Sequence, residues 1–355
     1  MNSDKNKAAE IRKHPWGNVG GREVSLYELS CAGGITVKVS DYGGILQSFF
    51  TPEPDARDIV LGYDTVEEYV RSSTFFGAFV GPLADRTGGA RLSLAGKEIL
   101  LEANAGNDCM HSGSAGFHAR VWNTEILPDG VCFSSSFEDD PLPGKLDVSV
   151  FYSIPAPDIL RITYEAACSE ETALSFTNHS YFNLEEGTQN RSCLNDRLTL
   201  FASQYAETDC SADPLVTGNL RSVEGTPFDF RGGVRIGDAV SAADFPEIES
   251  AGGGVDNYFL TDGSGFRPHA HLRSADGKTE LLCMSDAPGV LVYSGNGLQA
   301  EKGKGGEIYG KHGGIAFETE NFPNAVNIPV LRSSVLIRPG ERFHTVTEYV
   351  VNVNG

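Results

Sequence analysis

Several features that mark well-known protein classes are missing from this 355-residue sequence. It has no run of about 18 apolar residues, so we expect no membrane-spanning helix. Its 28 basic residues are outnumbered by 48 acidic ones, and the formal net charge of −20 disfavours nucleic acids and anionic membranes as partners. None of its seven cysteines forms a C-x-x-C pair, which excludes zinc-ribbon and thioredoxin-like motifs. A small neutral molecule is the ligand class that fits best.

The sequence also shows no sign of secretion. Its N-terminus has no apolar core of the kind that a signal peptide needs. The cysteines are odd in number and scattered, at positions 31, 109, 132, 168, 193, 210 and 283, which indicates a reducing compartment. We therefore predict a soluble, cytoplasmic protein.

Short segments of alternating polarity recur through almost the whole chain, with turn residues between them and no long amphipathic helix. This pattern predicts an all-β sandwich or barrel. No fixed-period repeat and no linker-like change in composition divides the chain, so we predict a single domain over residues 1–355, with a polar N-terminal tail to about Pro15. We expect a long loop through Pro214 to Val223.

Short helical turns are expected at three places, residues 65–70, 234–240 and 245–248. The first has a capping signature, with Thr65 at the N-cap position and Glu68 three residues later.

The stretch Ala173–Leu184, A-L-S-F-T-N-H-S-Y-F-N-L, is the most informative part of the sequence. Interpreted as one strand, it has two faces. One face has Leu174, Phe176, Asn178, Ser180 and Phe182, and the other has Ser175, Thr177, His179, Tyr181 and Asn183. The second face is almost wholly polar and carries a histidine, which suits a ligand surface. A polar outer face with a surface histidine is the alternative.

A second stretch, Gly313–Asn327, reads G-G-I-A-F-E-T-E-N-F-P-N-A-V-N. On a strand, Glu318 shares a face with Gly314 and Ala316, whose small side chains leave room for a flat ligand. An exposed glutamate beside a loop is the alternative. A carboxylate and an imidazole in one cleft would form an acid–base pair whose pKa values can be set near neutrality.

Three other patterns carry less weight. Gly305–Lys311 fits most of the phosphate-loop pattern, but His312 follows it where Ser or Thr would bind Mg²⁺, and Gly313-Gly314 follow in place of a helix. His269 and His271 have no third metal ligand nearby in the sequence, which favours a solvated strand edge. The adjacent acidic pairs at 170–171 and 185–186 point to opposite faces of a strand and are expected to be surface charge.

The sequence resembles the aldose 1-epimerase (galactose mutarotase) family. The resemblance rests first on T-N-H-S-Y-F-N-L at 177–184 and F-E-T-E-N-F-P-N-A-V-N at 317–327. D-Y-G-G-I-L-Q-S-F, D-I-V-L-G-Y-D and R-L-S-L-A-G-K are similar to the family's N-terminal part and occur in the same order, so the likeness covers nearly the entire chain.

The resemblance implies a large antiparallel β-sandwich with an open sugar cleft on one sheet, and interconversion of the α and β anomers of free aldoses without metal or cofactor. By the family's motif His179 would be the general acid and Glu318 the general base. Arg86, His111 and Asp256 fall where the family places sugar-binding residues, and the Asp256 match rests on V-D-N-Y-F alone.

The chain departs from the family pattern at four positions. Asp85 stands beside Arg86 where the family usually has Asn, and Ser112 follows His111 where it usually has Gly. Glu320 replaces a usual Gln, and Asn324 a usual Asp. These changes leave the proposed catalytic pair intact and bear on substrate preference.

Alternative functions follow from the same residues. A hexose-phosphate 1-epimerase would need clustered Arg or Lys at the cleft, and none is obvious. A non-catalytic sugar-binding protein would be expected to have lost His179 or Glu318. A glycoside hydrolase would need two carboxylates, for which Asp256 and Glu318 are the only candidates. We expect a sugar as the small-molecule partner and a monomer or homodimer.

Overall fold

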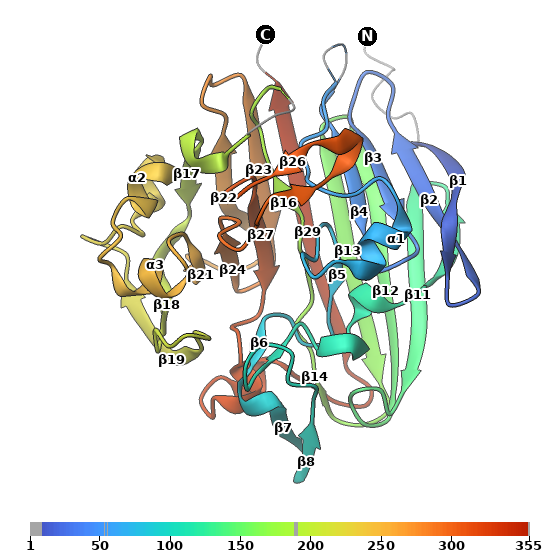
Figure 1. The fold of residues 1–355 in the computed structure, drawn as a ribbon. Helices are drawn as coiled ribbons and strands as arrows, with labels where there is room; N and C mark the ends of the chain where they lie inside the picture. The colour runs from blue at the N-terminus through green and yellow to red at the C-terminus, as the bar shows by residue number, and fades with distance from the viewer. Residues whose placement is uncertain (1–8, 53, 55, 188–190, 354–355) are drawn as a thin grey trace.

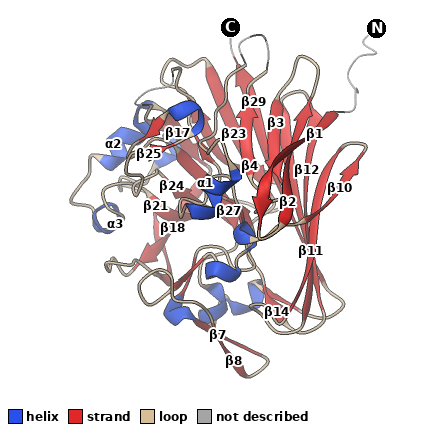
Figure 2. Cartoon of the chain, turned by 45° about the vertical axis from the view of Figure 1, so that its right-hand side comes forward, coloured by secondary structure: helices blue, strands red, loops and turns tan. Residues whose placement is uncertain are grey.

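The computed structural model describes residues 9–52, 54, 56–187 and 191–353, and it consists mainly of antiparallel strands (Figures 1 and 2). The all-β prediction is confirmed, because two large sheets dominate the described chain. Residues 145–152 of β12 and 159–166 of β13 alternate buried with exposed or half-buried residues, as strands with one face on a core should.

The larger sheet has nine strands in the order β10-β11-β12-β13-β29-β23-β22-β17-β20. Strand β29, at the C-terminal end of the described chain, lies between β13 and β23 and pairs with both, so it joins the middle of the chain to its later part. Single-domain organisation stays a prediction. The bounds of these strands are β10 Asn123–Leu127, β11 Gly130–Glu138, β12 Lys145–Ala156, β13 Ile159–Cys168, β29 Arg342–Val353, β23 Thr279–Ser285, β22 Arg267–Arg273, β17 Arg197–Leu200 and β20 Val234–Arg235.

The second sheet has six strands in the order β16-β27-β24-β21-β18-β19. Its inner strands β27 and β24 are buried along almost their whole length, on both faces. The bounds are β16 Tyr181–Phe182, β27 Ile315–Glu320, β24 Gly289–Tyr293, β21 Asp256–Thr261, β18 Ala202–Thr208 and β19 Val216–Ser222.

Smaller sheets complete the strand structure. One has four strands, β1 Glu10–Val19, β2 Arg22–Ser30, β3 Thr36–Ser40 and β4 Leu46–Phe50. The others are pairs: β14 Thr172–Ala173 with β28 Leu336–Ile337, β15 Thr177–Asn178 with β5 Phe79–Val80, β6 Arg86–Thr87 with β9 Cys109–Met110, β7 Arg91–Leu94 with β8 Lys97–Leu100, and β25 Glu301–Lys302 with β26 Ile308–Tyr309. The β7–β8 hairpin projects from the lower end of the molecule in Figure 1.

The helices are short and connect strands along the chain, and most of them lie toward the left and lower sides of the molecule in Figure 2. The predicted capping of the first is confirmed, because the Glu68 carboxylate accepts a hydrogen bond from the backbone N–H of Thr65 at 3.0 Å. The α-helices are α1 Val66–Arg71, α2 Ile236–Val240 and α3 Pro246–Ser250. The 3-10 turns are η1 Gly88–Ala90, η2 Gly113–Ala115, η3 Phe117–Ala119, η4 Cys193–Asn195, η5 Phe230–Gly232, η6 Lys304–Gly306, η7 Ala325–Asn327 and η8 Arg332–Ser334. In the described residues, no helix is long and apolar enough to cross a membrane.

The two large sheets pack together through aromatic side chains. Phe317 on β27 stacks on Phe182 of β16 with ring centroids 6.1 Å apart, and the Tyr349 ring of β29 lies 4.8 Å from Phe182. The Tyr349 hydroxyl donates a hydrogen bond to the Phe317 carbonyl at 3.2 Å. One face of β27 is therefore fixed against the nine-stranded sheet, and its other face is turned away from that sheet.

Two predicted boundaries were wrong. Strand β1 begins at Glu10, inside the predicted tail that ran to about Pro15, and forms a hairpin with β2 through Gly20 and Gly21. Strand β19 occupies most of the predicted loop from Pro214 to Val223. Both strands are mostly exposed or half-buried, and β19 lies at a sheet edge, where β18 is its one partner among the described residues. Edge strands need no alternating apolar face, so the pattern of the sequence did not show them.

The predicted single strand over Ala173–Leu184 is also wrong. This stretch forms three two-residue strands, β14, β15 and β16, which pair with three different partners. Its polar residues from Ser175 to Asn183 are nevertheless buried, so the alternative of a polar outer face is wrong too. Backbone hydrogen bonds to other segments explain the breaks. The N–H of Ser175 donates to the Pro82 carbonyl, and the N–H of His179 donates to the Ala78 carbonyl.

We expect Phe79→Ala to destabilise the fold strongly. The Phe79 ring is fully buried and packs 5.1 Å from Phe117, 5.4 Å from Trp122 and 5.5 Å from Phe176. Removing such a ring costs about 3–5 kcal/mol of unfolding free energy, because it leaves a cavity. Urea unfolding would measure this, with Leu100→Ala as control, since Leu100 is 71% exposed. Equal losses in the two variants would contradict the packing described here.

Candidate active site

Strand β27 turns the Glu318 carboxylate away from the core, toward a cavity. Its neighbours face the other sheet: Phe317 packs on Phe182, and the Thr319 hydroxyl is 2.6 Å from the Thr347 hydroxyl of β29. Glu318 points the opposite way and is only 1% exposed. The alternative of a surface glutamate is therefore wrong, and the predicted strand face is confirmed.

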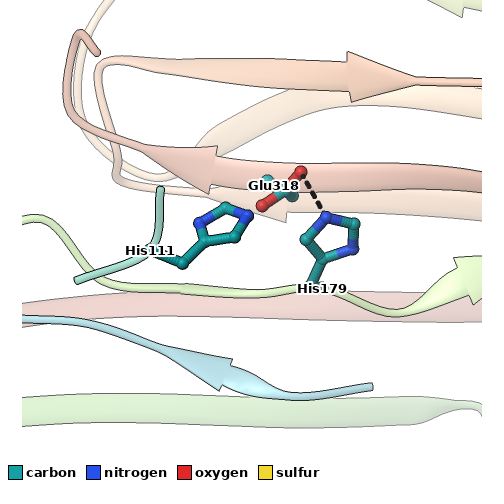
Figure 3. Close-up of side chains that lie close together, drawn as sticks. All are labelled: His111, His179 and Glu318. Atoms are coloured by element: carbon teal, nitrogen blue, oxygen red, sulfur yellow. Dashed lines mark ion pairs between the residues drawn. The ribbon is translucent and has the colours of Figure 1, made fainter. Parts of the chain in front are cut away.

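His179 approaches Glu318 from the segment between β15 and β16. Its backbone is held on both sides, because its N–H donates to the Ala78 carbonyl and its own carbonyl accepts from Gly77, both at 2.9 Å. Its Nε2 lies 3.3 Å from Glu318 Oε1, as the dashed line in Figure 3 marks. The Tyr181 ring stacks on the imidazole with centroids 4.8 Å apart, which fixes the plane of the ring.

His111 joins this pair from a third segment, just after β9 (Figure 3). Its Nδ1 accepts a hydrogen bond from the backbone N–H of Asp85 at 3.1 Å. An Nδ1 that accepts must be unprotonated, so the neutral ring carries its proton on Nε2. Burial lowers the pKa of His111 well below its usual value, with repulsion from His179 as the next cause, and keeps it neutral.

The three side chains have the spacing of a metal site, with ligand atoms of His111, His179 and Glu318 within 4.8 Å of one another. A coordinating His111 would need a free lone pair on Nε2 and therefore a proton on Nδ1. That proton would face the Asp85 N–H that donates to the same nitrogen. Metal-binding histidines instead present their second nitrogen to an acceptor. The donor set does not fit a three-ligand metal centre.

Arg86 and Asp256 complete the set of predicted residues. Asp256 is the first residue of β21, and the Arg86 guanidinium lies 3.6 Å from the Asp85 carboxylate. Arg86 and Asp256 line one cavity of about 180 Å³, together with His111, His179 and Glu318. The structure thus brings all five predicted residues together, although they come from five separate segments.

The cavity has further lining residues that the sequence analysis did not select as binding residues. Phe75 lies 4.7 Å from the His111 ring and 6.0 Å from the His179 ring, between centroids. It adopts a left-handed backbone with φ of 57°, which is rare outside glycine and common at functional sites. An aromatic residue in an apolar run gives no signal of this in the sequence. Tyr293, Ser73, Met110 and Leu291 complete the lining, together with Asp85 and Tyr181.

Burial shifts the pKa values of the charged groups at the cavity. It raises the pKa of Glu318 well above its usual value, with repulsion from Asp85 and Asp256 adding to the effect. It lowers the pKa of His179 to about 4 and raises that of Asp256 to about 6. Burial opposes the charge of Arg86, but attraction to Asp85 and Asp256 outweighs it and raises the pKa of Arg86. Burial therefore favours the uncharged forms of both members of the pair, a protonated Glu318 and a neutral His179.

The less favoured sequence patterns lie elsewhere. The predicted solvated strand edge is wrong for His269, which is buried on β22, an inner strand of the nine-stranded sheet. Its ring lies 2.7 Å from the Thr261 hydroxyl and 3.2 Å from the Ser285 carbonyl, and His271 lies 3.2 Å from Glu280. Within the Gly305–Lys311 segment, η6 is followed by β26 and not by a helix. The acidic residues at 185 and 186 take part in contacts with Asn195 and Lys278. None of these groups lines the cavity.

Comparison with known proteins gives consistent results. A family model described as aldose 1-epimerase matches residues 25–350. Galactose mutarotase of Rattus norvegicus is 34% identical over 301 residues, which are 84% of this chain and 85% of the rat protein. Aldose 1-epimerase of Escherichia coli K12 is 32% identical over 337 residues, 93% of this chain and 95% of that protein. A solved structure, the GalM/aldose epimerase homologue from C. elegans, has a TM-score of 0.84 at 27% identity and covers 94% of this chain and 100% of its own.

The buried His179 predicts a component of acid destabilisation. Its pKa is about 4 in the folded protein and about 6.5 in an unfolded chain, so its contribution to stability is present above pH 6.5 and is lost as the pH falls toward 4. We expect this group to account for up to about 3 kcal/mol of the decline in unfolding free energy over that range. Urea unfolding at a series of pH values should show a shallower decline for His179→Asn. An identical slope in both proteins would contradict a buried neutral imidazole.

Proposed function

The chain belongs to the aldose 1-epimerase family, and we propose that this isomerase interconverts the α and β anomers of free hexoses such as D-galactose and D-glucose. The observation that carries the proposal is the 3.3 Å contact between His179 Nε2 and Glu318 Oε1 on the wall of a cavity. We further propose that Glu318 is the general base and His179 the general acid, and that Arg86, His111 and Asp256 bind the sugar.

The reaction needs one proton removed and one supplied. Glu318 as carboxylate takes the proton of the C1 hydroxyl, and protonated His179 gives its proton to the ring oxygen as the C1–O bond to the ring breaks. The products of this step are an open-chain aldehyde, a protonated Glu318 and a neutral His179. Rotation about C1–C2 presents the other face of the carbonyl, and the two groups then exchange roles to close the ring.

Burial favours one of the two protonation states that this scheme uses. Burial favours the proton on Glu318, with His179 neutral. This is the state that the mechanism assigns to the open-chain intermediate. The ring-opening state differs only by transfer of that proton to His179, so the cycle needs no exchange with solvent. Two polar atoms, His179 Nδ1 and Glu318 Oε2, are buried without a hydrogen-bond partner in the described part of the chain, and a sugar hydroxyl could satisfy either.

The other lining groups suit a neutral polyol. The Arg86 guanidinium and the Nε2–H of His111 donate hydrogen bonds, and the Asp256 carboxylate accepts them. The carbon rings of Phe75, Tyr181 and Tyr293 can contact the C–H faces of a sugar. A hexose phosphate fits this lining less well, because the Arg86 guanidinium is the one arginine or lysine side chain among the described lining residues and already has the Asp85 and Asp256 carboxyl groups near it.

Loss of either member of the pair should abolish most of the catalysis. We expect Glu318→Gln and His179→Asn each to slow the enzyme-catalysed conversion of α-D-galactose by about 10²–10⁴-fold, the usual contribution of a positioned acid or base. Polarimetry of freshly dissolved sugar at neutral pH, with and without protein, measures this. His269→Asn is the matched control, a buried histidine outside the cavity. The proposal is wrong if folded variants convert anomers at the wild-type rate.

The carboxylates of the lining predict discrimination against phosphate. We expect kcat/KM for α-D-glucose 6-phosphate to be at least about tenfold below that for α-D-glucose, since a phosphate dianion would be repelled by Asp85 and Asp256. Coupled assays of the two anomerisations at equal ionic strength would show this. A higher kcat/KM for the phosphorylated sugar would transfer the proposal to a hexose-phosphate 1-epimerase.

A further inference from the structure

Glu320 lies two residues beyond Glu318 on β27 and on the same face of the strand. It is 2% exposed, although a glutamate buried to this degree is normally paired with a cation. Its pairing partner on β24 is Gly289, where no side chain stands opposite. The ring of Tyr258 occupies that space instead, since an added Cβ at Gly289 would lie 2.4 Å from the Tyr258 hydroxyl oxygen.

The surroundings of the Glu320 carboxyl group hold no compensating charge among the described residues. Its Oε2 accepts a hydrogen bond from the Ser175 hydroxyl at 3.4 Å, and its Oε1 is buried without a partner. The charged groups that act on it are Glu318 on its own strand and Asp85 on the segment before β6, both acidic. From β21, the neutral side chain that faces Glu320 is Tyr258. Burial raises the pKa of Tyr258 well above its usual value, and the positive charge of Arg267 offsets part of this rise.

Glu320 also connects the strand of the proposed base to the segment that carries Arg86. Ser175, its hydrogen-bond donor, pairs through its backbone with Pro82 at 2.8 Å and with Ala84 at 2.9 Å. The next residue on the chain, Asn321, donates from its side chain to the Leu174 carbonyl at 3.3 Å. The end of β27 is thus tied to the segment from 82 to 86 through residues 174 and 175.

We propose that Glu320 is a positioning residue for Glu318 and that it acts as a neutral carboxylic acid. An ionised Glu320 would place a second negative charge on the face of β27 that carries the base. That charge would hold the Glu318 proton more tightly and oppose base catalysis near neutral pH. Burial, with repulsion from Asp85 and Glu318, raises the pKa of Glu320 well above its usual value, in agreement with the neutral form. The proposal rests on the proposed role of Glu318.

Two variants test the neutral form of Glu320 without relying on turnover. We expect Glu320→Gln, a neutral isostere, to gain stability over the wild type as the pH rises above about 4.5, where an unfolded glutamate ionises and the folded Glu320 does not. The difference should reach about 2 °C or more in Tm by pH 8.

Infrared difference spectra at pH 7 should show that Glu320→Gln removes a protonated carboxyl band. Glu348→Gln is the matched control, since the buried Glu348 is paired with Arg161 at 2.6 Å and should lose a carboxylate band and stability instead.

The positioning role is tested by rescue. We expect Glu320→Leu to lower kcat about tenfold in the polarimetric assay, because it removes the tie to Ser175, and Glu320→Gln to recover most of that loss. A shift of the acid limb of kcat/KM by one pH unit or more in Glu320→Gln would overturn the proposal, since it would mean that a negative charge beside Glu318 had been removed. Loss of a carboxylate band in that variant would overturn it as well. Absence of turnover in the wild type would instead contradict the proposed function, and the infrared and stability results would still decide the state of Glu320.

Discussion

The pairing of one imidazole with one carboxylate away from water is the constraint on which the site depends. His179 and Glu318 are 5% and 1% exposed, so little of either side chain is open to the solvent that would weaken their 3.3 Å contact. Burial alone would force both groups to be neutral, and their proximity allows a single proton to serve both. A pair of this kind can act as acid and base in turn, because each transfer leaves the total number of protons unchanged.

Holding that pair in place is the task of two sheets packed face to face. Phe317 and Thr319 fix one face of β27 against β29, and strand geometry then commits Glu318 and Glu320 to the opposite face. A shift of one residue in the register of β27 against β24 would bury Phe317 in the cavity and place Glu318 in the aromatic layer. The apolar core therefore specifies the polar site, and the burial of Phe182 and Tyr349 is as necessary to it as the carboxylate itself.

Sequence reasoning predicted the parts of this arrangement that depend on the alternation of side chains along a strand and on short motifs. The face of Glu318 followed from the alternation of Ile315, Phe317 and Thr319, and the resemblance to a family selected His179, Arg86, His111 and Asp256. It did not predict the breaks in Ala173–Leu184, because hydrogen bonds from distant segments such as Ala78 and Pro82 set them. Phe75 was missed for a similar reason. Its position against two imidazoles depends on a left-handed backbone that no local pattern encodes.

The departures from the family pattern acquire a physical meaning in this setting. Asp85 and Glu320 each put a carboxyl group where the family usually has an amide, and both are buried next to Glu318. Asp85 has a cation beside it, Arg86 at 3.6 Å, whereas the partner of the Glu320 carboxyl group among the described residues is the Ser175 hydroxyl. Charge can therefore remain at position 85 far more readily than at position 320. A protonated carboxyl group has both a donor and acceptor oxygens, as an amide has both, so the neutral Glu320 that we propose would preserve the neutrality of that position. The acidic change that bears on a ligand is consequently the one at Asp85, which lines the cavity beside the guanidinium of Arg86.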